Sequence, residues 1–365
     1  MPKLKNIYIS SIYQNAGKTM VALGMYHIFR EYRLRTAFLK PVGQQTVPFH
    51  NREVDKDSYL IGEVYRCRRQ IAKMSPVTIG QGFTEKYILN PQKEELIDKI
   101  GASFRSLVKG KDAIIVEGTG HAGVGSVIDL SNADVARFLG SKVVIVCEGG
   151  IGRSIDEIML NKALFDLCGV EILGVIVNKV LPEKYERIKK ILGQGLKNKG
   201  LELLGVIPVA PLLSAPTIGQ VMNKLNLQLL CGQGSLSRRV KNTIVAAMEP
   251  SNMINYLAEG TLVLTSGDRV DNIMTAVSSH LITRGKKIRV SGIILSGGLT
   301  PEPKILELLR KSKIPMLLSS DDTYTVAGRV ESLICKIQKT DKDKILEARR
   351  LIKEYVDIDK IFANL

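Results

Sequence analysis

The sequence contains 365 residues, of which 45% are hydrophobic and 24% are charged, a composition typical of a soluble globular protein with about two domains. Lys and Arg exceed Asp and Glu enough to give a net charge of +16, which favours anionic ligands. Because the basic residues are dispersed and tryptophan is absent, nucleic acid is not an expected partner.

Short apolar runs alternate with longer amphipathic stretches in the first half of the chain. The apolar runs predict strands over 5–10, 36–39, 112–116, 142–147, 172–177 and 203–207. The amphipathic stretches predict helices over 18–32, 57–66, 92–109, 132–139, 154–168 and 183–199. Continuous apolar strands are typical of parallel sheets covered on both faces, so this alternation predicts a doubly wound α/β fold with right-handed crossovers.

Prolines 208, 211 and 216 and a Gly/Ser-rich stretch over 231–237 interrupt the alternation, so we place a domain boundary within 225–238. Beyond it, strands are predicted over 242–246, 261–265, 290–295 and 315–319. Helices are predicted over 251–258, 269–283, 302–311, 323–337 and 341–355. We therefore expect a larger α/β domain over 1–230, a smaller α/β domain over 236–340, and a C-terminal helical segment over 341–365.

The stretch YISSIYQNAGKTMVALG, residues 8–24, has the order of a phosphate-binding loop: strand, turn, lysine, hydroxyl, helix. Such a turn would aim backbone N–H groups at an anion, to which Lys18 would add its charge. The candidate nucleotide-binding residues of this turn are Asn15, Ala16, Gly17, Lys18, Thr19 and Met20. The usual pattern has a glycine where this chain has Ile12, so an ordinary strand–turn–helix connection remains an alternative.

Three further polar residues come at the ends of predicted strands, where ligands of open α/β sheets bind. Lys40 precedes Pro41 in FLKPVG, and Glu117 ends the apolar run of IIVEGTGHAGVG, where a carboxylate could bind Mg²⁺. Asn178, in GVIVNKVLP, could read a purine edge with its amide or simply cap a turn. His121 is a possible acid or base, although a solvated loop histidine is the better interpretation.

Together these stretches resemble the dethiobiotin-synthetase-like family of P-loop proteins. The resemblance covers roughly residues 4 to 220 and rests on GKT at 17–19, KPV at 40–42, the EG-x-G strand end, VNK at 177–179 and GVIP-x-x-P at 205–211. The amino-terminal region of long phosphotransacetylases, which joins such a domain to a DRTGG domain, is more similar still. Three stretches of the second half fit it: LVLTSGDRVDNI (262–273), SGIILSGGLTP (291–301) and IPMLLSSDDTYTVAGRV (314–330).

The resemblance implies a site for ATP and Mg²⁺ with specific residue roles. Lys18 and Thr19 would bind phosphate and Mg²⁺, and Lys18 and Lys40 would act on the transferring group. Glu117 and Asp57 would join Thr19 as metal ligands, although Asp55 lies close enough in sequence to be the true equivalent of Asp57. Asn178 would face the base.

Two departures limit what the resemblance implies about activity. Ser11 or Ile12 replaces the early glycine of the loop, and Gly43-Gln44 stands where the synthetase has residues that hold its diamine substrate. The chain also ends where the acyltransferase domain of a phosphotransacetylase would begin. We therefore expect neither dethiobiotin synthetase nor phosphotransacetylase activity.

The leading functional hypothesis is an ATP-binding protein with a regulatory or ligand-sensing DRTGG domain and slow or absent hydrolysis. The alternatives are a ligase-like enzyme that activates a carboxylate or carbamate through the γ-phosphate, and a scaffold with a vestigial site. A small anionic ligand is expected in the second domain at Gly267-Asp268-Arg269 and Ser296-Gly297-Gly298, although these residues could equally cap a helix and turn the chain. A homo-oligomer is expected.

Cysteine usage and the chain start bear on where the protein resides. Five scattered cysteines form no Cys-x-x-Cys pair, which argues against a zinc site or disulfide framework and favours a reducing compartment. We see no secretory segment and no apolar run of about 18 residues. A cytoplasmic protein that does not enter the membrane is therefore expected.

Overall fold

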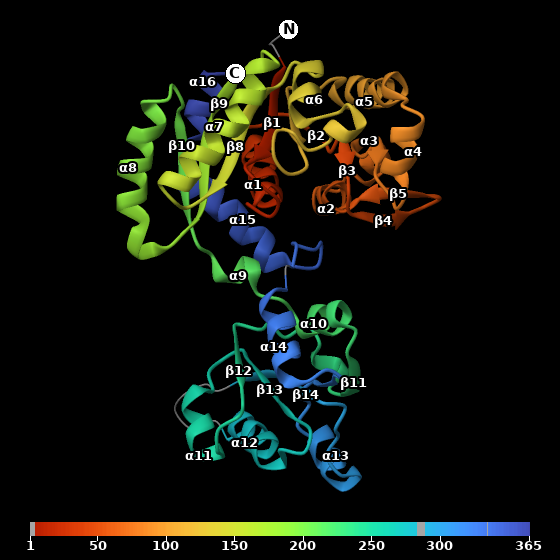
Figure 1. Ribbon diagram of the computed structural model, residues 1–365, viewed down its shortest axis with the longest axis vertical. Coiled ribbons are helices and arrows are strands. Elements are labelled where there is room, and N and C mark those ends of the chain that lie inside the picture. The colour runs from red at the N-terminus through yellow and green to blue at the C-terminus, as the bar shows by residue number, and fades with distance from the viewer. Residues whose placement is uncertain (1–3, 283–288, 334) are drawn as a thin grey trace. The chain divides into compact units, whose positions relative to one another are not determined.

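The computed structural model describes residues 4–282, 289–333 and 335–365. The chain forms two compact units (Figure 1). The first unit comprises Met1–Ala210 together with Ile337–Leu365, and the second comprises Pro211–Lys336. Across the described ranges, no helix has both the length and the apolar character needed to cross a bilayer.

A six-stranded parallel sheet forms the centre of the first unit. In spatial order its strands are β10 (Leu203–Pro208), β9 (Ile172–Val180), β8 (Lys142–Glu148), β1 (Lys5–Ser11), β7 (Ala113–Glu117) and β2 (Thr36–Leu39). All six were predicted, because each is a continuous apolar run that the sheet buries on both faces. The predicted doubly wound α/β fold is confirmed.

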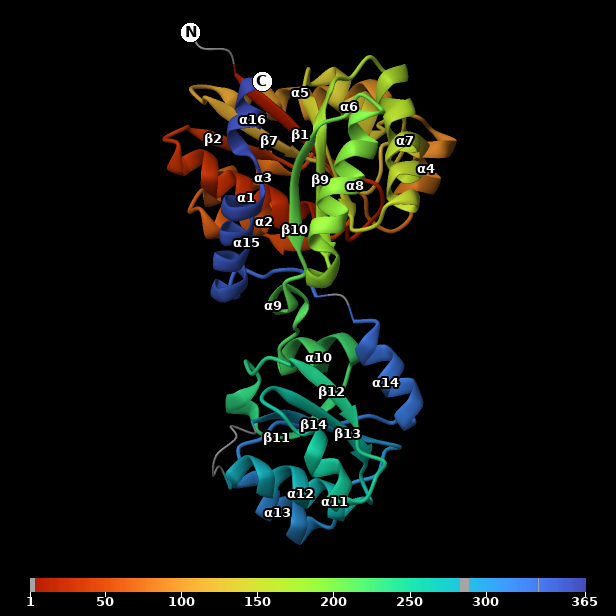
Figure 2. The same cartoon turned by 90° about the vertical axis from the view of Figure 1, so that its left-hand side faces the viewer.

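Helices cover both faces of this sheet. They are α1 (Lys18–Glu31), α2 (Lys56–Val64), α5 (Lys93–Val108), α6 (Asn132–Phe138), α7 (Gly152–Leu167) and α8 (Tyr185–Lys197). Figure 2 shows α1 on one side of the sheet and α7 and α8 on the other. This distribution is expected when the chain moves outward from β1 in one direction and then returns across it, since each crossover is right-handed.

Several short elements between β2 and β7 were not predicted. They are β3 (Val42–Gly43), β4 (Thr46–Phe49), β5 (Arg52–Asp55), α3 (Ile71–Met74), β6 (Val77–Thr78) and α4 (Phe83–Leu89). Each is too short to show a clear period, and Pro48 lies inside β4. The β4–β5 hairpin nevertheless matters for the site, because it delivers the chain to α2.

The C-terminal segment belongs to the first unit. Helix α15 (Lys342–Tyr355) packs along α1, and the approach is so close that a Cβ added at Gly24 would lie 2.3 Å from Ile352. Helix α16 (Ile358–Ala363) places Phe362 against Phe29, with ring centroids 4.9 Å apart. The segment expected to stand apart as 341–365 therefore completes the larger unit, because its apolar face covers α1.

The second unit contains a five-stranded sheet of its own. The strand order is β11 (Gln228–Cys231), β15 (Met316–Leu318), β14 (Val290–Ser296), β13 (Thr261–Ser266) and β12 (Asn242–Val245), with β11 antiparallel to β15 and the other pairs parallel. Residues of α10 (Ile218–Leu225) and α14 (Thr323–Glu331) pack on one face. Residues of α11 (Pro250–Met253), α12 (Val270–Leu281) and α13 (Pro303–Arg310) pack on the other.

Some second-half elements differ from the prediction. The predicted helix over 251–258 is one turn of α11 followed by a 3-10 turn over Ile254–Tyr256. The predicted helix over 323–337 ends at Glu331, because the chain then passes back to the first unit. Residue 283, the predicted end of another helix, and residue 334 lie outside the described residues.

The expected boundary at 225–238 falls inside the second unit. Strand β11 pairs with β15, and α10 buries Ile218 and Val221 in the second core. The Gly/Ser-rich stretch forms a turn in which Gly232, with φ 81°, approaches the backbone of Pro315. Glycine and serine therefore mark a tight turn here rather than a linker.

We predict that residues 211–336 fold on their own. This fragment keeps both cores of the second unit, whereas a fragment over 236–365 lacks α10 and β11 and exposes the face of α15 that covers α1. Thermal unfolding followed by circular dichroism should give a cooperative transition for 211–336 and a weaker or absent one for 236–365. A non-cooperative transition for 211–336 would show that the unit depends on the rest of the chain.

Candidate functional site

The GKT turn joins β1 to α1 at the carboxyl end of the sheet. Gly17 is the N-cap of α1 with φ 108°, and Asn15 has φ 66°; Ala16 between them is buried. Both positive φ values suit glycine or asparagine. The turn therefore places the N-terminus of α1, with Lys18 as its first residue, where an anion could bind.

The missing early glycine has a simple explanation in the backbone. The N–H of Ile12 donates to the carbonyl of Val146 at 3.2 Å, and the N–H of Ser11 donates to the carbonyl of Gly120 at 3.2 Å. Both residues are therefore hydrogen-bonded to neighbouring segments, although the chain bends at Ile12. Both Ser11 and Ile12 belong to the described residues, and neither has a positive φ. Glycine is therefore not required at either position. Ser11 also accepts a hydrogen bond from Lys18, with Nζ and Oγ 2.6 Å apart.

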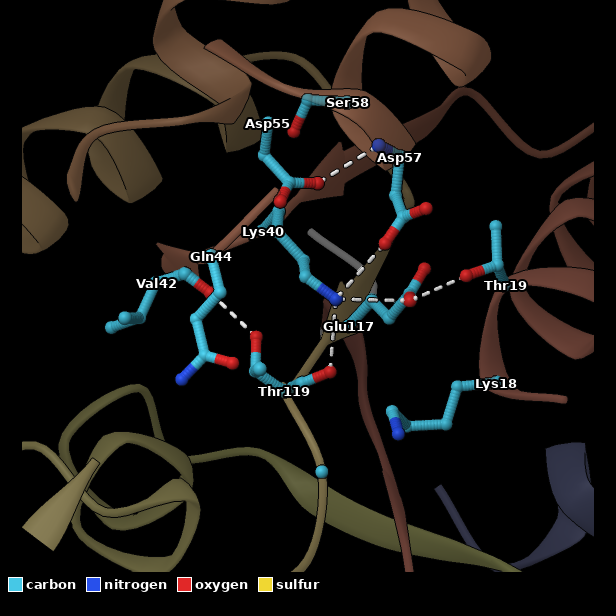
Figure 3. Close-up of polar contacts among 12 residues, drawn as sticks. Lys18, Thr19, Lys40, Val42, Gln44, Asp55, Asp57, Ser58, Glu117 and Thr119 are labelled. Carbon is cyan, nitrogen blue, oxygen red and sulfur yellow. Dashed lines mark hydrogen bonds and ion pairs between the residues drawn. The ribbon is translucent and has the colours of Figure 1, made fainter. Parts of the chain in front are cut away.

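A buried cluster of charges lies beside this turn (Figure 3). Lys40 Nζ is 3.0 Å from Glu117 Oε1 and 3.2 Å from Asp57 Oδ2, and it donates to the carbonyl of Gly118 at 3.0 Å. The Thr19 hydroxyl donates to the same Glu117 oxygen at 2.9 Å. The register of the sheet explains why Lys40 and Glu117 lie side by side. They directly follow Leu39 and Val116, which pair with each other.

The charge of Lys40 is stabilised by its neighbours. Burial alone would lower the pKa of this ammonium, but the carboxylates of Glu117, Asp57 and Asp55 outweigh burial and raise the pKa above its usual range. Lys40 is 3% exposed, so these charges act with little solvent screening. Lys40 therefore remains a cation throughout the neutral pH range.

The structure distinguishes Asp55 from Asp57. Asp55 is the N-cap of α2, where its Oδ1 accepts a hydrogen bond from the N–H of Asp57 at 2.8 Å. Gly43 leaves room for it, because an added Cβ would lie 2.5 Å from the Asp55 Cβ. Asp57 instead points its carboxylate at Lys40. Of these two residues, Asp57 forms the ion pair with Lys40, whereas Asp55 caps the helix that carries Asp57 and acts on Lys40 through its charge.

Residues at the ends of β8 and β9 contact the turn from the other side. The Asn178 amide donates to the carbonyl of Ala16 at 2.9 Å, and a Cβ at Gly17 would lie 2.1 Å from Asn178 Nδ2. Lys179 donates to the carbonyl of Asn15 at 2.9 Å and pairs with Glu148 at 2.5 Å. Asn178, which is expected to face the base, thus donates one N–H of its amide to the loop.

Sequence reasoning missed Ser11, Glu148 and Lys179. The available signal was position alone: each lies at or next to the carboxyl end of a buried parallel strand. His121, in contrast, is exposed and accepts a hydrogen bond from the N–H of Gly123 at 3.2 Å. It lies in a loop that Asn132 holds through the carbonyls of Thr119 and His121.

The donor set is suitable for Mg²⁺. Within the described residues no group of three or more His, Cys, Asp or Glu side chains is arranged to hold a metal ion. Mg²⁺ instead needs one or two carboxylates beside phosphate oxygens, together with water. Glu117, Asp57 and the Thr19 hydroxyl supply such oxygens next to the start of α1.

The predicted second-unit tracts lie on neighbouring strands, since Ser266 pairs with Ser296. The N–H groups of Gly297 and Gly298, however, donate to the carbonyls of Asp321 and Ser319, both at 2.8 Å. They are therefore engaged in the chain turn, which was the alternative interpretation of these glycines.

Arg269 of the same predicted site has partners of its own. It pairs with Asp271 at 2.9 Å and lowers the pKa of that carboxyl to about 2. Its guanidinium also donates to the carbonyls of Ala247 and Met248. Arg269, rather than Asp268, occupies the N-cap of α12, and no side-chain hydrogen bond caps that helix.

The parallel sheet, the GKT turn and the hydroxyl–carboxylate pair beside it define the first unit as a P-loop NTPase-type domain. Residues 5–217 match the AAA domain family AAA_26, and residues 220–333 match the DRTGG domain. Because the first match covers more than half of the chain, the protein belongs to the AAA_26 family, whose dethiobiotin-synthetase-like P-loop domain is here followed by a DRTGG domain.

Curated relatives include phosphate acetyltransferases. The chain is 29% identical to that of Nitratidesulfovibrio vulgaris, over 99% of this chain and 51% of the relative, and 27% identical to that of Synechocystis, over 99% and 52%. A third, from Haemophilus influenzae, is 23% identical over 98% and 52%. The chain thus spans about half the length of the curated relatives it matches.

Solved structures are similar at a lower level. A plasmid partition protein from Borrelia burgdorferi bound to AMPPNP is 14% identical, with a TM-score of 0.39 over 57% of this chain and 88% of that one. The CBS and DRTGG domains of the Clostridium perfringens pyrophosphatase, complexed with diadenosine tetraphosphate, are 16% identical, with a TM-score of 0.29 over 48% and 85%.

Replacing Lys40 with Met should destabilise the first unit strongly. The change leaves Glu117 and Asp57 buried without their cation, which typically costs about 3–5 kcal/mol. Because the folded-state pKa of Lys40 is raised, its contribution is complete below its unfolded pKa of about 10.4 and is lost only as pH rises through the folded value. The difference between wild type and variant should therefore be constant from about pH 7 to pH 9.

Urea denaturation at several pH values measures this difference. Arg153→Met is a matched control, because it breaks an exposed i,i+4 pair with Glu157 and should cost at most about 1 kcal/mol. Equal stabilities of the Lys40→Met and Arg153→Met variants would contradict the importance of the buried cluster.

Proposed function

We propose that the first unit binds ATP with Mg²⁺ and that the DRTGG domain regulates this unit or senses a small anionic ligand. The single observation that carries the proposal is the meeting of Thr19 and Glu117 at 2.9 Å directly beside the start of α1. A hydroxyl and a carboxylate so placed, next to a P-loop lysine, supply what a nucleotide-bound Mg²⁺ requires from a protein.

The turn and the nearby carboxylates have separate roles in this proposal. Lys18 and the N–H groups at the start of α1 would bind the phosphates, which are favoured there by charge and by the helix dipole. Thr19, Glu117 and Asp57 would hold the metal. When bound, Mg²⁺ would neutralise part of the charge on the phosphate oxygens.

Slow or absent hydrolysis is part of the proposal. Attack by water needs a group that orients the water molecule. Glu117 and Asp57 are both paired with Lys40, and the raised pKa of Lys40 keeps that residue protonated. This arrangement favours ATP binding over ATP hydrolysis.

One observation favours a ligase-like enzyme as the second candidate. Lys40 is a buried cation beside the proposed phosphate site. Together with Lys18 it would stabilise negative charge during transfer of the γ-phosphoryl group to a carboxylate or carbamate. Release of phosphate from ATP that depends on such an acceptor would favour this candidate over simple binding.

Lys18→Ala should weaken ATP binding. A charge-assisted hydrogen bond to phosphate contributes about 1.5–3 kcal/mol, so we expect a loss of roughly tenfold or more. Isothermal titration calorimetry with Mg-ATP measures it, and Lys99→Ala, which removes an exposed lysine of α5, is the control. Equal affinity of wild type and Lys18→Ala would remove the basis of the proposal.

Asp57→Ala and Asp55→Ala should separate metal binding from helix capping. Wild type should bind ATP more tightly with Mg²⁺ than with EDTA. In Asp57→Ala this gain in affinity should be smaller, because one oxygen ligand of the metal is lost. Asp55→Ala should lower the stability by about 1 kcal/mol through loss of the α2 cap and leave that gain unchanged. Titrations with Mg²⁺ and with EDTA decide, and the reverse pattern would make Asp55 the metal ligand.

A further inference from the structure

The end of β9 contacts two consecutive carbonyl groups of the GKT turn. Asn178 Nδ2 is 2.9 Å from the Ala16 oxygen, and Lys179 Nζ is 2.9 Å from the Asn15 oxygen. Strand register brings Glu148, at the end of β8, directly opposite Asn178. From there Glu148 reaches Lys179, with Oε1 and Nζ 2.5 Å apart. Two strand ends thus hold one short piece of loop.

These contacts determine which way the loop amides point. In a trans peptide the C=O and the N–H point in opposite directions. When the carbonyls of Asn15 and Ala16 are held toward β9, the N–H groups of Ala16 and Gly17 must face the other way. The positive φ values at Asn15 and Gly17 are compatible with such successive amides converging on an anion.

Lys179 itself has an unusual backbone. Its φ is 58°, the left-handed region that costs a residue other than glycine on the order of 1 kcal/mol. Such conformations persist only where the surroundings fix them, and they concentrate at functional sites. The side chain is 46% exposed, so its pair with Glu148 contributes little to stability. From this conformation the Lys179 ammonium donates to the Asn15 carbonyl at 2.9 Å.

Glu148 also influences a residue of the loop. Burial, together with the nearby Glu148 carboxylate, raises the pKa of the Tyr13 hydroxyl. Tyr13 belongs to the same turn as Asn15. The carboxylate therefore pairs with Lys179 and also acts through its charge on the loop that Lys179 holds.

We propose that Lys179, oriented by Glu148, is a positioning residue of the phosphate-binding loop, and that Asn178 acts with it on the loop carbonyls. The inference rests on the proposed nucleotide-binding function and deepens it. The inference assigns to Asn178 and Lys179 of the VNK stretch a contribution to the affinity for phosphate. Loss of the Lys179 side chain should therefore weaken the binding of a ligand that has a base and of one that lacks a base to the same extent.

The first experiment needs no ligand. Hydrogen–deuterium exchange of the amides in residues 12–20 should be faster in Lys179→Met than in wild type, and Lys179→Arg should restore protection. Lys142→Met is the matched control, because Lys142 also contacts a carboxylate, Glu171, and a backbone carbonyl, that of Asn364, from its place at the start of β8. It should leave exchange in the loop unchanged.

The second experiment compares ATP with inorganic tripolyphosphate by calorimetry. Lys179→Met and Asn178→Ala should weaken both by about tenfold, as expected when one hydrogen bond that orients the loop is lost. Lys142→Met should weaken neither. Glu148→Gln should weaken the binding of ATP and of tripolyphosphate less than Lys179→Met does. The double variant Glu148→Gln/Lys179→Met should bind both ligands as weakly as Lys179→Met alone, since Glu148 acts through Lys179.

Each outcome has a clear meaning. Unchanged exchange in Lys179→Met overturns the inference, as does faster exchange with unchanged affinity for both ligands. A loss confined to ATP in Asn178→Ala would return that residue to base recognition. If wild type binds neither ligand while the loop loosens in Lys179→Met, the proposed function fails and the holding of the loop by Lys179 stands.

Discussion

A lysine ammonium buried between two carboxylates is the interaction on which the larger unit of this protein depends. Removing charges from water costs several kcal/mol per ion, so a buried cluster persists only when its members pair closely. Lys40, Glu117 and Asp57 meet this requirement because three elements deliver them to one point: β2, β7 and α2. Displacing any one of these elements would leave a charge without its partner. The cluster therefore fixes the edge of the sheet that carries the candidate site.

The Thr19 hydroxyl extends this constraint to the phosphate-binding turn. Through its hydrogen bond to Glu117, the first turn of α1 is held against the same carboxylate that neutralises Lys40. On the opposite side, the ends of β8 and β9 hold the loop carbonyls. The loop is thus fixed from two sides by side chains. Glycine is not required at its first position, because neither Ser11 nor Ile12 has a positive φ.

Continuous apolar strands were predictable from the sequence because burial on both faces of a parallel sheet requires them. The positions of Lys40 and Glu117 at strand ends followed from the same pattern, and the register of β2 with β7 confirms that they are neighbours. The β4–β5 hairpin could not be predicted, since four-residue strands carry no readable period. The distinction between Asp55 and Asp57 was equally out of reach, because it depends on which of them begins α2.

Long-range packing accounts for the remaining differences. Nothing in the composition of 341–365 indicates that its apolar face covers α1. The need for glycine at position 24 is explained only by the packing of Ile352 against it. The first prolines of the stretch 208–237 lie at the boundary between the units, which follows Ala210, whereas its glycines mark a turn inside the second unit. A glycine-rich turn inside a sheet, such as that at Gly232, has the same local sequence as a linker. The sequence around Asn178 likewise does not reveal that its amide contacts the loop.

The return of the chain to the first unit at Ile337 makes the second unit an insertion with two covalent connections. A single proteolytic cut in a loop of the second unit would leave the two pieces of the first unit joined by the packing of α15 and α16 on α1, β10 and Phe29. Such a nicked chain would separate into two fragments on a denaturing gel and migrate as one particle under native conditions. A stop codon before Ile337, in contrast, would remove the helices that cover α1, so truncation would damage the first unit more than nicking does.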